Sequence, residues 1–125
     1  MSRLLEAPKD AMRFYIRGIV YMVDCRDIVY METQNRYVQV HTTGRPLFVP
    51  YLRLCECLEQ SDGRFLRCHR SILVNPSYIE DIQLNRKRII LCQGRGELAI
   101  GRKYEGEVRR LFDVGGKSQY TKRDI

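Results

Sequence analysis

The sequence predicts a mainly β domain in which short antiparallel strands form small sheets, accompanied by two short helices. Its 125 residues fall into short runs of β-branched and aromatic residues, separated by turn residues. The connections between runs are too short for the crossovers that parallel strands need, so antiparallel hairpins are expected. Only two stretches change to the spacing of an amphipathic helix. A chain of this length is expected to form one domain with its own core.

The first half of the domain is expected to contain five strands. The runs that predict them are residues 14–16, 19–23, 28–31, 37–41 and 47–49. Gly18 separates the first two runs. Residues 34–36 form a natural hairpin tip before the fourth run, which alternates cleanly between its two faces.

A helix of about three turns is expected after Pro50, because apolar residues there recur at helical spacing. The face at i, i+3, i+4 and i+7 consists of Tyr51, Leu54, Cys55 and Leu58. Residues 61–63 end this helix. The strands expected next are residues 65–68, 73–74, 79–84, 89–92 and 98–100. A last helix is expected to start near Arg102, with Tyr104, Val108, Leu111 and Phe112 on its apolar face.

We expect the domain to occupy residues 13–113, with a lead-in or linker at 1–12 and a flexible tail at 114–125. Such a lead-in would suit a domain attached to something upstream. No stretch approaches 18 consecutive apolar residues, and the N-terminus lacks the long apolar run of a secretory signal. A cytoplasmic location is therefore expected.

The cysteines indicate neither a disulfide framework nor a metal site. Their number, five, is odd, and no Cys-x-x-Cys pair is present. Cys55 and Cys57 lie two residues apart on the expected helix, so they point away from each other and cannot share a metal. We expect reduced and mostly buried thiols, no metal and no cofactor. Cys68, beside His69, stays open as a redox-sensitive thiol.

The charge is concentrated in the second half of the chain. Residues 1–63 carry 8 basic and 8 acidic side chains, whereas residues 64–125 carry 14 basic and 7 acidic ones. The formal net charge of +7 therefore lies entirely in the second half. A basic half on a small domain favours a polyanionic partner, nucleic acid first, although a basic tail can also simply aid solubility.

Residues that could support catalysis are few, and no enzyme is expected. The chain has only two histidines, and Cys68 and His69 would point to opposite faces of an extended strand. Gly94 and Gly96 lack the lysine and the helix start of a phosphate-binding loop.

The most informative stretch is residues 65–82, Phe-Leu-Arg-Cys-His-Arg-Ser-Ile-Leu-Val-Asn-Pro-Ser-Tyr-Ile-Glu-Asp-Ile. It interleaves apolar anchors with side chains that can donate hydrogen bonds to phosphates or base edges. This stretch resembles the LytTR family of bacterial DNA-binding domains, whose pattern Phe-x-Arg-x-His-Arg-Ser, then Leu-Val-Asn and Ile-x-x-Ile, it matches closely. The resemblance covers roughly residues 14–112.

The resemblance implies an elongated stack of small antiparallel sheets that presents loops, and no recognition helix, to the DNA major groove. Carried over residue by residue, the DNA-binding positions are Asn35, Arg36, His69, Arg70, Arg102 and Lys103. Arg67 is a further candidate, as a phosphate contact. A cation at a helix start, as expected for Arg102 and Lys103, is also a natural phosphate site by itself. His69 could instead hold the turn from inside, and Arg67 could be part of a surface ladder. Asn75 is interpreted as structural, holding a turn before Pro76.

Two positions depart from the family pattern. Gly101 stands where the family usually has a serine before the arginine that opens the last helix. Glycine can still cap the helix, but a side-chain contact to phosphate is lost. Ile72 replaces an aromatic residue of many members, which we interpret as a packing change.

We therefore expect a sequence-specific, double-stranded DNA-binding domain of a bacterial transcriptional regulator, either a response-regulator output domain in a two-component system or a stand-alone protein. Without a heptad seam for an obligate dimer, only weak self-association is expected. The family resemblance implies that pairs of domains bind on direct repeats. One alternative is a small β-rich RNA-binding module, although the tyrosines are not arranged with the basic residues. Another is a protein-interaction module with an exposed sheet edge.

Overall fold

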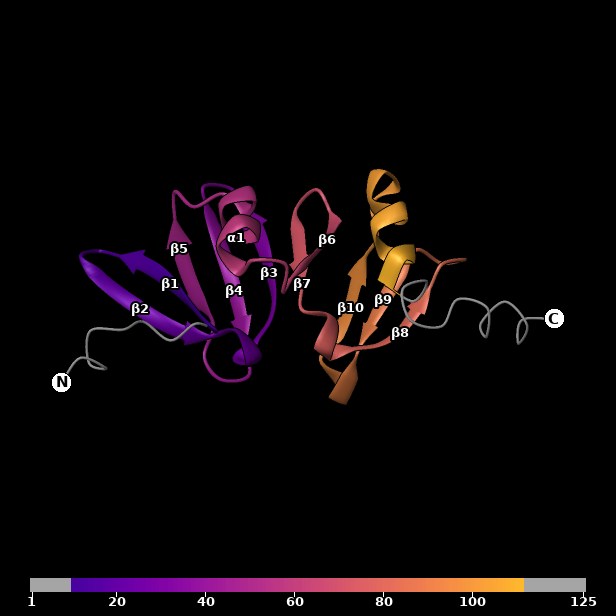
Figure 1. Ribbon diagram of the computed structural model, residues 1–125, viewed down its shortest axis with the longest axis horizontal. Coiled ribbons are helices and arrows are strands. Elements are labelled where there is room, and N and C mark those ends of the chain that lie inside the picture. Colours follow the sequence, from indigo (N-terminus) through magenta and orange to yellow (C-terminus); the bar gives the residue numbers. More distant parts are fainter. Residues whose placement is uncertain (1–9, 112–125) are drawn as a thin grey trace.

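The computed structural model describes residues 10–111, in which ten strands form three separate antiparallel sheets (Figure 1). The sheets follow one another along the long axis of the molecule: a two-stranded sheet at one end, a five-stranded sheet in the middle and a three-stranded sheet at the other end. The predicted fold class, mainly β with antiparallel strands and two short helices, is confirmed. The expected tail at 114–125 and the face residue Phe112 lie outside the described residues.

The first sheet is a hairpin of β1 (Ala11–Ile16) and β2 (Ile19–Asp24). Its two-residue turn, Arg17-Gly18, has positive φ at both positions, 50° and 84°, as tight hairpin turns require. The first strand starts at Ala11, inside the stretch that the sequence assigned to the lead-in. Met12 is fully buried and alternates with Phe14, so this strand contributes to the core from its second residue.

The central sheet has the strand order β5-β4-β3-β7-β6. Its strands are β3 (Ile28–Gln34), β4 (Tyr37–Thr42), β5 (Leu47–Pro50), β6 (Leu66–His69) and β7 (Ile72–Val74). Pairing of β3 with β7 joins the two halves of the chain. The third sheet has the order β10-β9-β8, formed by β8 (Ile79–Gln83), β9 (Arg88–Leu91) and β10 (Gly96–Ala99).

The first helix, α1 (Leu54–Ser61), starts three residues later than predicted and is shorter. Tyr51 is not part of its buried face: it has a positive φ of 58° and is 83% exposed. The helix buries Leu54, Cys57 and Ser61, so the predicted face residue Cys55 is exposed and Cys57 takes the inner position. The predicted end is confirmed, with Asp62 and Gly63 in the left-handed region.

Single turns of 3-10 helix join several strands: η2 (Cys25–Asp27), η3 (Pro76–Tyr78), η4 (Cys92–Gly94) and η5 (Arg102–Tyr104). The last of these continues into an α-helix at 105–111, which is the predicted last helix. Asn75 has the structural role that the sequence predicted. Its Oδ1 accepts from the Ser77 N–H (3.0 Å), and its Nδ2 donates to the Ile28 carbonyl (2.8 Å).

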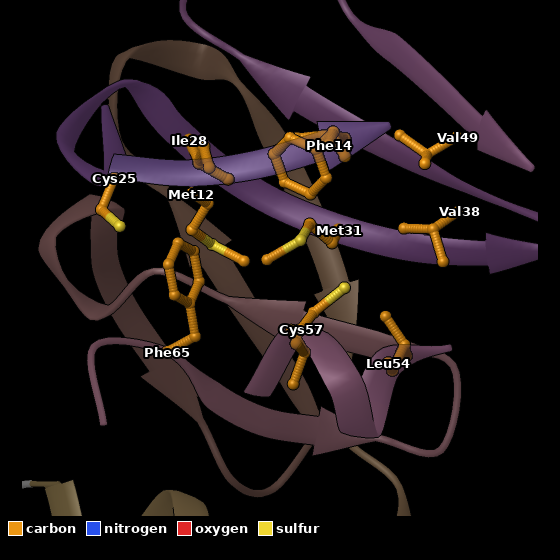
Figure 2. Packing of buried hydrophobic residues seen from close by; sticks show 12 residues of the cluster. Met12, Phe14, Cys25, Ile28, Met31, Val38, Val49, Leu54, Cys57 and Phe65 are labelled. Carbon is orange, nitrogen blue, oxygen red and sulfur yellow. The ribbon is translucent and has the colours of Figure 1, made fainter. Parts of the chain in front are cut away.

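Two hydrophobic clusters form the core, and β7 lies between them. Leu73 belongs to the first cluster, with β1 and α1, whereas Ile72 and Val74 belong to the second, beneath the third sheet. Figure 2 shows Met12 and Met31 pointing toward one another inside the first cluster. A strand buried on both faces reads as a continuous apolar run, which explains the run at 72–74.

Candidate nucleic-acid interface

Three of the segments predicted to contact DNA lie along one edge of the molecule. They are the β3–β4 turn at 35–36, the β6–β7 turn at 70–71 and the start of the last helix at 102–103 (Figure 1, upper edge). The Thr33 N–H donates to the Ser71 carbonyl (2.9 Å), which ties β3 to the β6–β7 turn. The Gly101 N–H donates to the Cys68 carbonyl (2.8 Å), which ties the helix start to the same turn. We call these three segments the basic edge.

The β3–β4 turn presents two exposed side chains, Asn35 and Arg36. Asn35 has a φ of 56°, which asparagine tolerates better than most residues. Below the turn, Gln34 Nε2 donates to Gln39 Oε1 across the hairpin (3.0 Å). The predicted hairpin tip is therefore confirmed, and it rests on a cross-strand hydrogen bond.

At the end of β6, directly before the β6–β7 turn, His69 is half-buried and its Nδ1 accepts a hydrogen bond from the Ser71 N–H (3.1 Å). This is the turn-holding arrangement that the sequence left open for His69. With Nδ1 as the acceptor, a neutral imidazole carries its proton on Nε2. Arg70, at the tip of the turn, is exposed.

Arg67 holds the backbone of this turn from the side. Its Nε donates to the His69 carbonyl (3.0 Å), and its guanidinium also donates to the Arg70 carbonyl. The guanidinium carbon lies 5.4 Å from the centre of the Tyr104 ring, a cation–π contact with the start of the last helix. Arg67 therefore links two parts of the basic edge through hydrogen bonds and ring stacking.

Gly101 brings the last helix close to the β6–β7 turn. A Cβ at this position would lie 3.4 Å from His69 Cα and 3.3 Å from Tyr104 Cδ2. Gly101 occupies the N-cap position in extended conformation and offers no side-chain cap, so the first turn of the helix lacks that hydrogen bond. Arg102 and Lys103 follow it and are exposed. Exposed cations beside free helix N–H groups favour an anion at this point.

The basic edge differs from the other basic turn of the protein in its ion pairs. In the turn between β8 and β9, Arg86 and Arg88 each lie 3.8 Å from Glu97, and Lys87 pairs with Glu105. The hydrogen bond from Lys87 is the main cause that lowers the pKa of Glu105. By contrast, within residues 10–111 no ion pair involves the four cations of the basic edge, Arg36, Arg70, Arg102 and Lys103.

Cys68 does not have the environment of a reactive thiol. It is fully buried, its Sγ faces the Ile72 carbonyl at 3.9 Å, and burial raises its pKa to about 12. Reactive cysteines need thiolate character and access, and Cys68 has neither. Among the described residues there is no group of three metal-ligating side chains, and no helix long and apolar enough to cross a membrane.

Two residues beside the basic edge were missed in the sequence. Tyr104 was assigned only to an apolar helix face, although its ring also stacks on Arg67. Tyr51 was assigned to a buried face, although it is exposed beside the β3–β4 turn, where its N–H donates to the Arg36 carbonyl (2.9 Å). Because a proline is typical of a helix start, Pro50 led to the prediction that Tyr51 begins the helix. No signal in the sequence indicated that Tyr51 is exposed beside the β3–β4 turn.

Comparison with known proteins identifies the family to which the chain is similar. Residues 18–113 match the family model of the LytTr DNA-binding domain. The sensory transduction protein LytT of Bacillus subtilis is 28% identical over 97 residues, covering 76% of this chain and 40% of the relative. The CO-responsive transcriptional regulator RcoM of Rhodospirillum rubrum is 32% identical over 99 residues, covering 74% of this chain and 40% of the relative. The chain thus spans about 40% of the length of these curated relatives.

A solved LytTr DNA-binding domain from Bacillus cereus has a similar fold. It aligns with a TM-score of 0.66 at 19% sequence identity, covering 84% of this chain and 98% of that one. At this identity the likeness concerns the fold alone.

Proposed function

The chain belongs to the LytTR family of DNA-binding domains, and from this premise we propose that it is the sequence-specific DNA-binding domain of a bacterial transcriptional regulator. A domain of this family binds DNA and is not an enzyme. The observation that carries the finer proposal is the basic edge, where three segments present cations that form no ion pair within the described residues. Such cations can release the counterions condensed on DNA phosphates.

The roles along the basic edge follow from the chemistry of each side chain. Arg70, at the tip of a turn that can enter the major groove, is assigned to base edges, because its planar fork matches guanine. Asn35 is assigned to base edges in the same way, because asparagine can pair with adenine. Arg36, Arg102 and Lys103 are assigned to phosphates.

His69 and Arg67 are assigned to the shape of the turn as well as to DNA. With His69 Nδ1 used by Ser71, its Nε2–H is the group left to donate to DNA. Arg67 already donates to two turn carbonyls, so we place its main contribution in holding Arg70 in position. We therefore expect His69 and Arg67 to fix the conformation of the β6–β7 turn that carries Arg70.

Self-association is proposed to be weak, with two domains binding side by side on direct repeats. Two copies on one face of the duplex require half-site centres separated by a whole number of helical turns, about 10.5 base pairs each. Inserting about five base pairs between half-sites is expected to abolish paired occupancy, and inserting about ten to restore it. Footprinting on such duplexes tests this; occupancy that is indifferent to spacing would contradict it.

The alternative of a protein-interaction module has one observation in its favour. β2 is an edge strand whose first four residues, Ile19 to Met22, are all exposed. An apolar edge of this kind can accept another strand. It does not account for the basic edge, and a gel shift with duplex DNA and matched RNA separates the DNA-binding, RNA-binding and protein-interaction functions.

The first test is the salt dependence of binding to duplex DNA. If the four cations of the basic edge and the basic side chains near them neutralise about four to six phosphates, log K is expected to fall against log salt with a slope of about −4 to −5. A slope near zero would contradict the assignment of the basic edge. Operator-like duplexes are obtained first by selection from a random pool.

The second test separates contacts that recognise bases from contacts that only bind phosphates. Arg70→Ala is expected to weaken binding to selected duplexes by a factor equivalent to about 1–3 kcal/mol while affecting random duplexes much less. Lys103→Ala is expected to weaken both alike. If Arg70→Ala lowers the affinity for selected and random duplexes by the same factor, Arg70 contacts a phosphate and not a base.

A further inference from the structure

The junction between β5 and α1 places an exposed aromatic residue and an exposed arginine next to the basic edge. Tyr51 is the most exposed of the large hydrophobic residues in the described part of the chain, at 83%. Its N–H donates to the carbonyl of Arg36, so its backbone is fixed to the β3–β4 turn (2.9 Å). Arg53, two residues later, is also exposed and occupies the N-cap of α1.

Both residues are poor choices for the fold at their positions. Tyr51 has a φ of 58°, a left-handed conformation in which a bulky side chain is a genuine outlier. Arg53 places a positive charge at the positive end of a helix, where serine, threonine, aspartate or asparagine is preferred, and it makes no side-chain cap. Residues that break local rules without a packing gain are expected at functional sites.

Tyr51 has two arginines among its mainly apolar neighbours. It lines an open hollow of about 550 Å³ between β1 and the end of β5, together with Arg13 and Arg17. Within residues 10–111, none of Arg13, Arg17 and Arg53 takes part in an ion pair with a carboxylate. The surface beside the β3–β4 turn is therefore aromatic and positively charged, a combination that suits a sugar–phosphate backbone.

We propose that Tyr51 and Arg53 form a further DNA contact, which grips the sugar–phosphate backbone beside the segment touched by the β3–β4 turn. Arg53 contacts a phosphate, and the Tyr51 ring packs on the adjoining deoxyribose with its hydroxyl free to donate to a phosphate oxygen. This inference rests on the proposed DNA-binding function and extends the basic edge by one element. It predicts contacts that position the domain without selecting a base.

The structure suggests variants that remove each contact and favour the fold at the same time. Tyr51→Asn removes the ring and introduces a residue that tolerates positive φ. Arg53→Ser removes the cation and introduces a preferred N-cap. Both variants are expected to melt at or above the temperature of the wild type and yet to bind DNA more weakly. The matched control is Arg45→Gln, an exposed arginine in the loop at the opposite end of the β4–β5 hairpin.

The magnitude for Arg53→Ser follows from counterion release. Losing one phosphate contact is expected to reduce affinity about fivefold at 0.15 M salt and about fifteenfold at 0.05 M salt, and to make the salt slope shallower by about 1. The loss is expected to be the same on selected and random duplexes. Arg45→Gln is expected to change neither the affinity nor the slope.

A set of trimmed duplexes makes the test independent of any change in folding. The selected duplex is shortened stepwise from each end, and wild-type protein, Tyr51→Asn and Arg53→Ser are titrated against every length. At one end, trimming is expected to weaken the wild type until it equals the variants, because the contacted phosphates are then missing. A variant deficit that persists on every trimmed duplex would overturn the proposed contact.

The outcomes separate the two proposals. Wild-type affinity for both variants, with losses for Arg70→Ala and Lys103→Ala, would overturn the Tyr51 and Arg53 contact and leave the proposed function standing. Failure of the wild-type chain to bind any duplex would overturn the proposed function, and the further contact with it. If both variants bind more weakly than the wild type, and this difference disappears when one end of the duplex is trimmed, the result supports both the proposed function and the further contact.

Discussion

Replacing Gly101 by serine tests how the last helix is fixed to the basic edge. Gly101 occupies the N-cap with φ −76° and ψ 147°, a conformation open to any residue, and it provides no side-chain cap. A serine Cβ would be in ordinary contact with His69 Cα at 3.4 Å and slightly tight against Tyr104 Cδ2 at 3.3 Å. The ring edge of Tyr104 must therefore move by a few tenths of an ångström, while its backbone can stay in place.

The expected effect combines two gains and one small cost. Replacing a glycine at an unstrained position stabilises by about 0.4–1 kcal/mol, because the unfolded chain loses freedom. A serine cap adds a few tenths of a kcal/mol over glycine. After the adjustment of Tyr104, Gly101→Ser is expected to raise the free energy of unfolding by about 0.5–1 kcal/mol. This corresponds to a rise in melting temperature of about 3–6 °C for a domain of this size.

The assay is thermal unfolding followed by circular dichroism, with Gly101→Ala as the matched control. Alanine introduces the same Cβ and the same loss of freedom but no oxygen, and it is a poor N-cap. Serine is therefore expected to exceed alanine by about 1 kcal/mol. Equal stability of the two variants, or a serine variant less stable than the wild type, would refute the assignment of Gly101 as an uncapped N-cap with room for a side chain.

Other parts of the structure lead to further predictions. Asn75→Ala is expected to lower the free energy of unfolding in urea by about 2–4 kcal/mol, because it leaves buried backbone groups without partners. Arg67→Gln is expected to weaken DNA binding without changing the salt slope; a slope shallower by about 1 would instead identify a phosphate contact. Burial lowers the pKa of His41 below its ordinary value, and its buried Nε2 has no hydrogen-bond partner in the described part of the chain. The unfolded chain therefore binds the proton more readily, so stability is expected to fall as the pH drops below about 6.5, and this fall should be smaller in His41→Phe. Cys55 is expected to react with iodoacetamide in the native protein, whereas Cys68 should react only on unfolding, as peptide mapping by mass spectrometry can show.

The sequence predicted most of the fold because its strands carry strong local signals. The alternation at 37–41 and the apolar run at 72–74 each correspond to a strand of the central sheet. The predicted helix face was right at Leu54, which is buried, and at Leu58, which packs against the first hydrophobic cluster. It was wrong at Cys55 and at Tyr51, which fits the helical spacing by chance. The positive φ of Tyr51, held by the carbonyl of Arg36, is a tertiary effect that periodicity cannot reveal.

The proposed DNA-binding positions were named one by one from the sequence, but the contacts that hold them together were not predicted. Arg36 and Arg70 lie far apart in the sequence, and only the pairing of β3 with β7 places their turns at the same end of the sheet. The stacking of Arg67 on Tyr104 likewise depends on the close approach of the last helix at Gly101. These contacts join separate elements, so no local pattern specifies them.

The central claim is that one edge of the molecule, formed by the β3–β4 turn, the β6–β7 turn and the start of the last helix, binds duplex DNA. The most direct measurement is an NMR titration of the isotope-labelled chain with a selected duplex, which follows the backbone amide of each residue. The largest shift changes are expected at residues 35–36, 69–71 and 101–104. Changes centred on the turn between β8 and β9, or on the loop between β4 and β5, would contradict the claim.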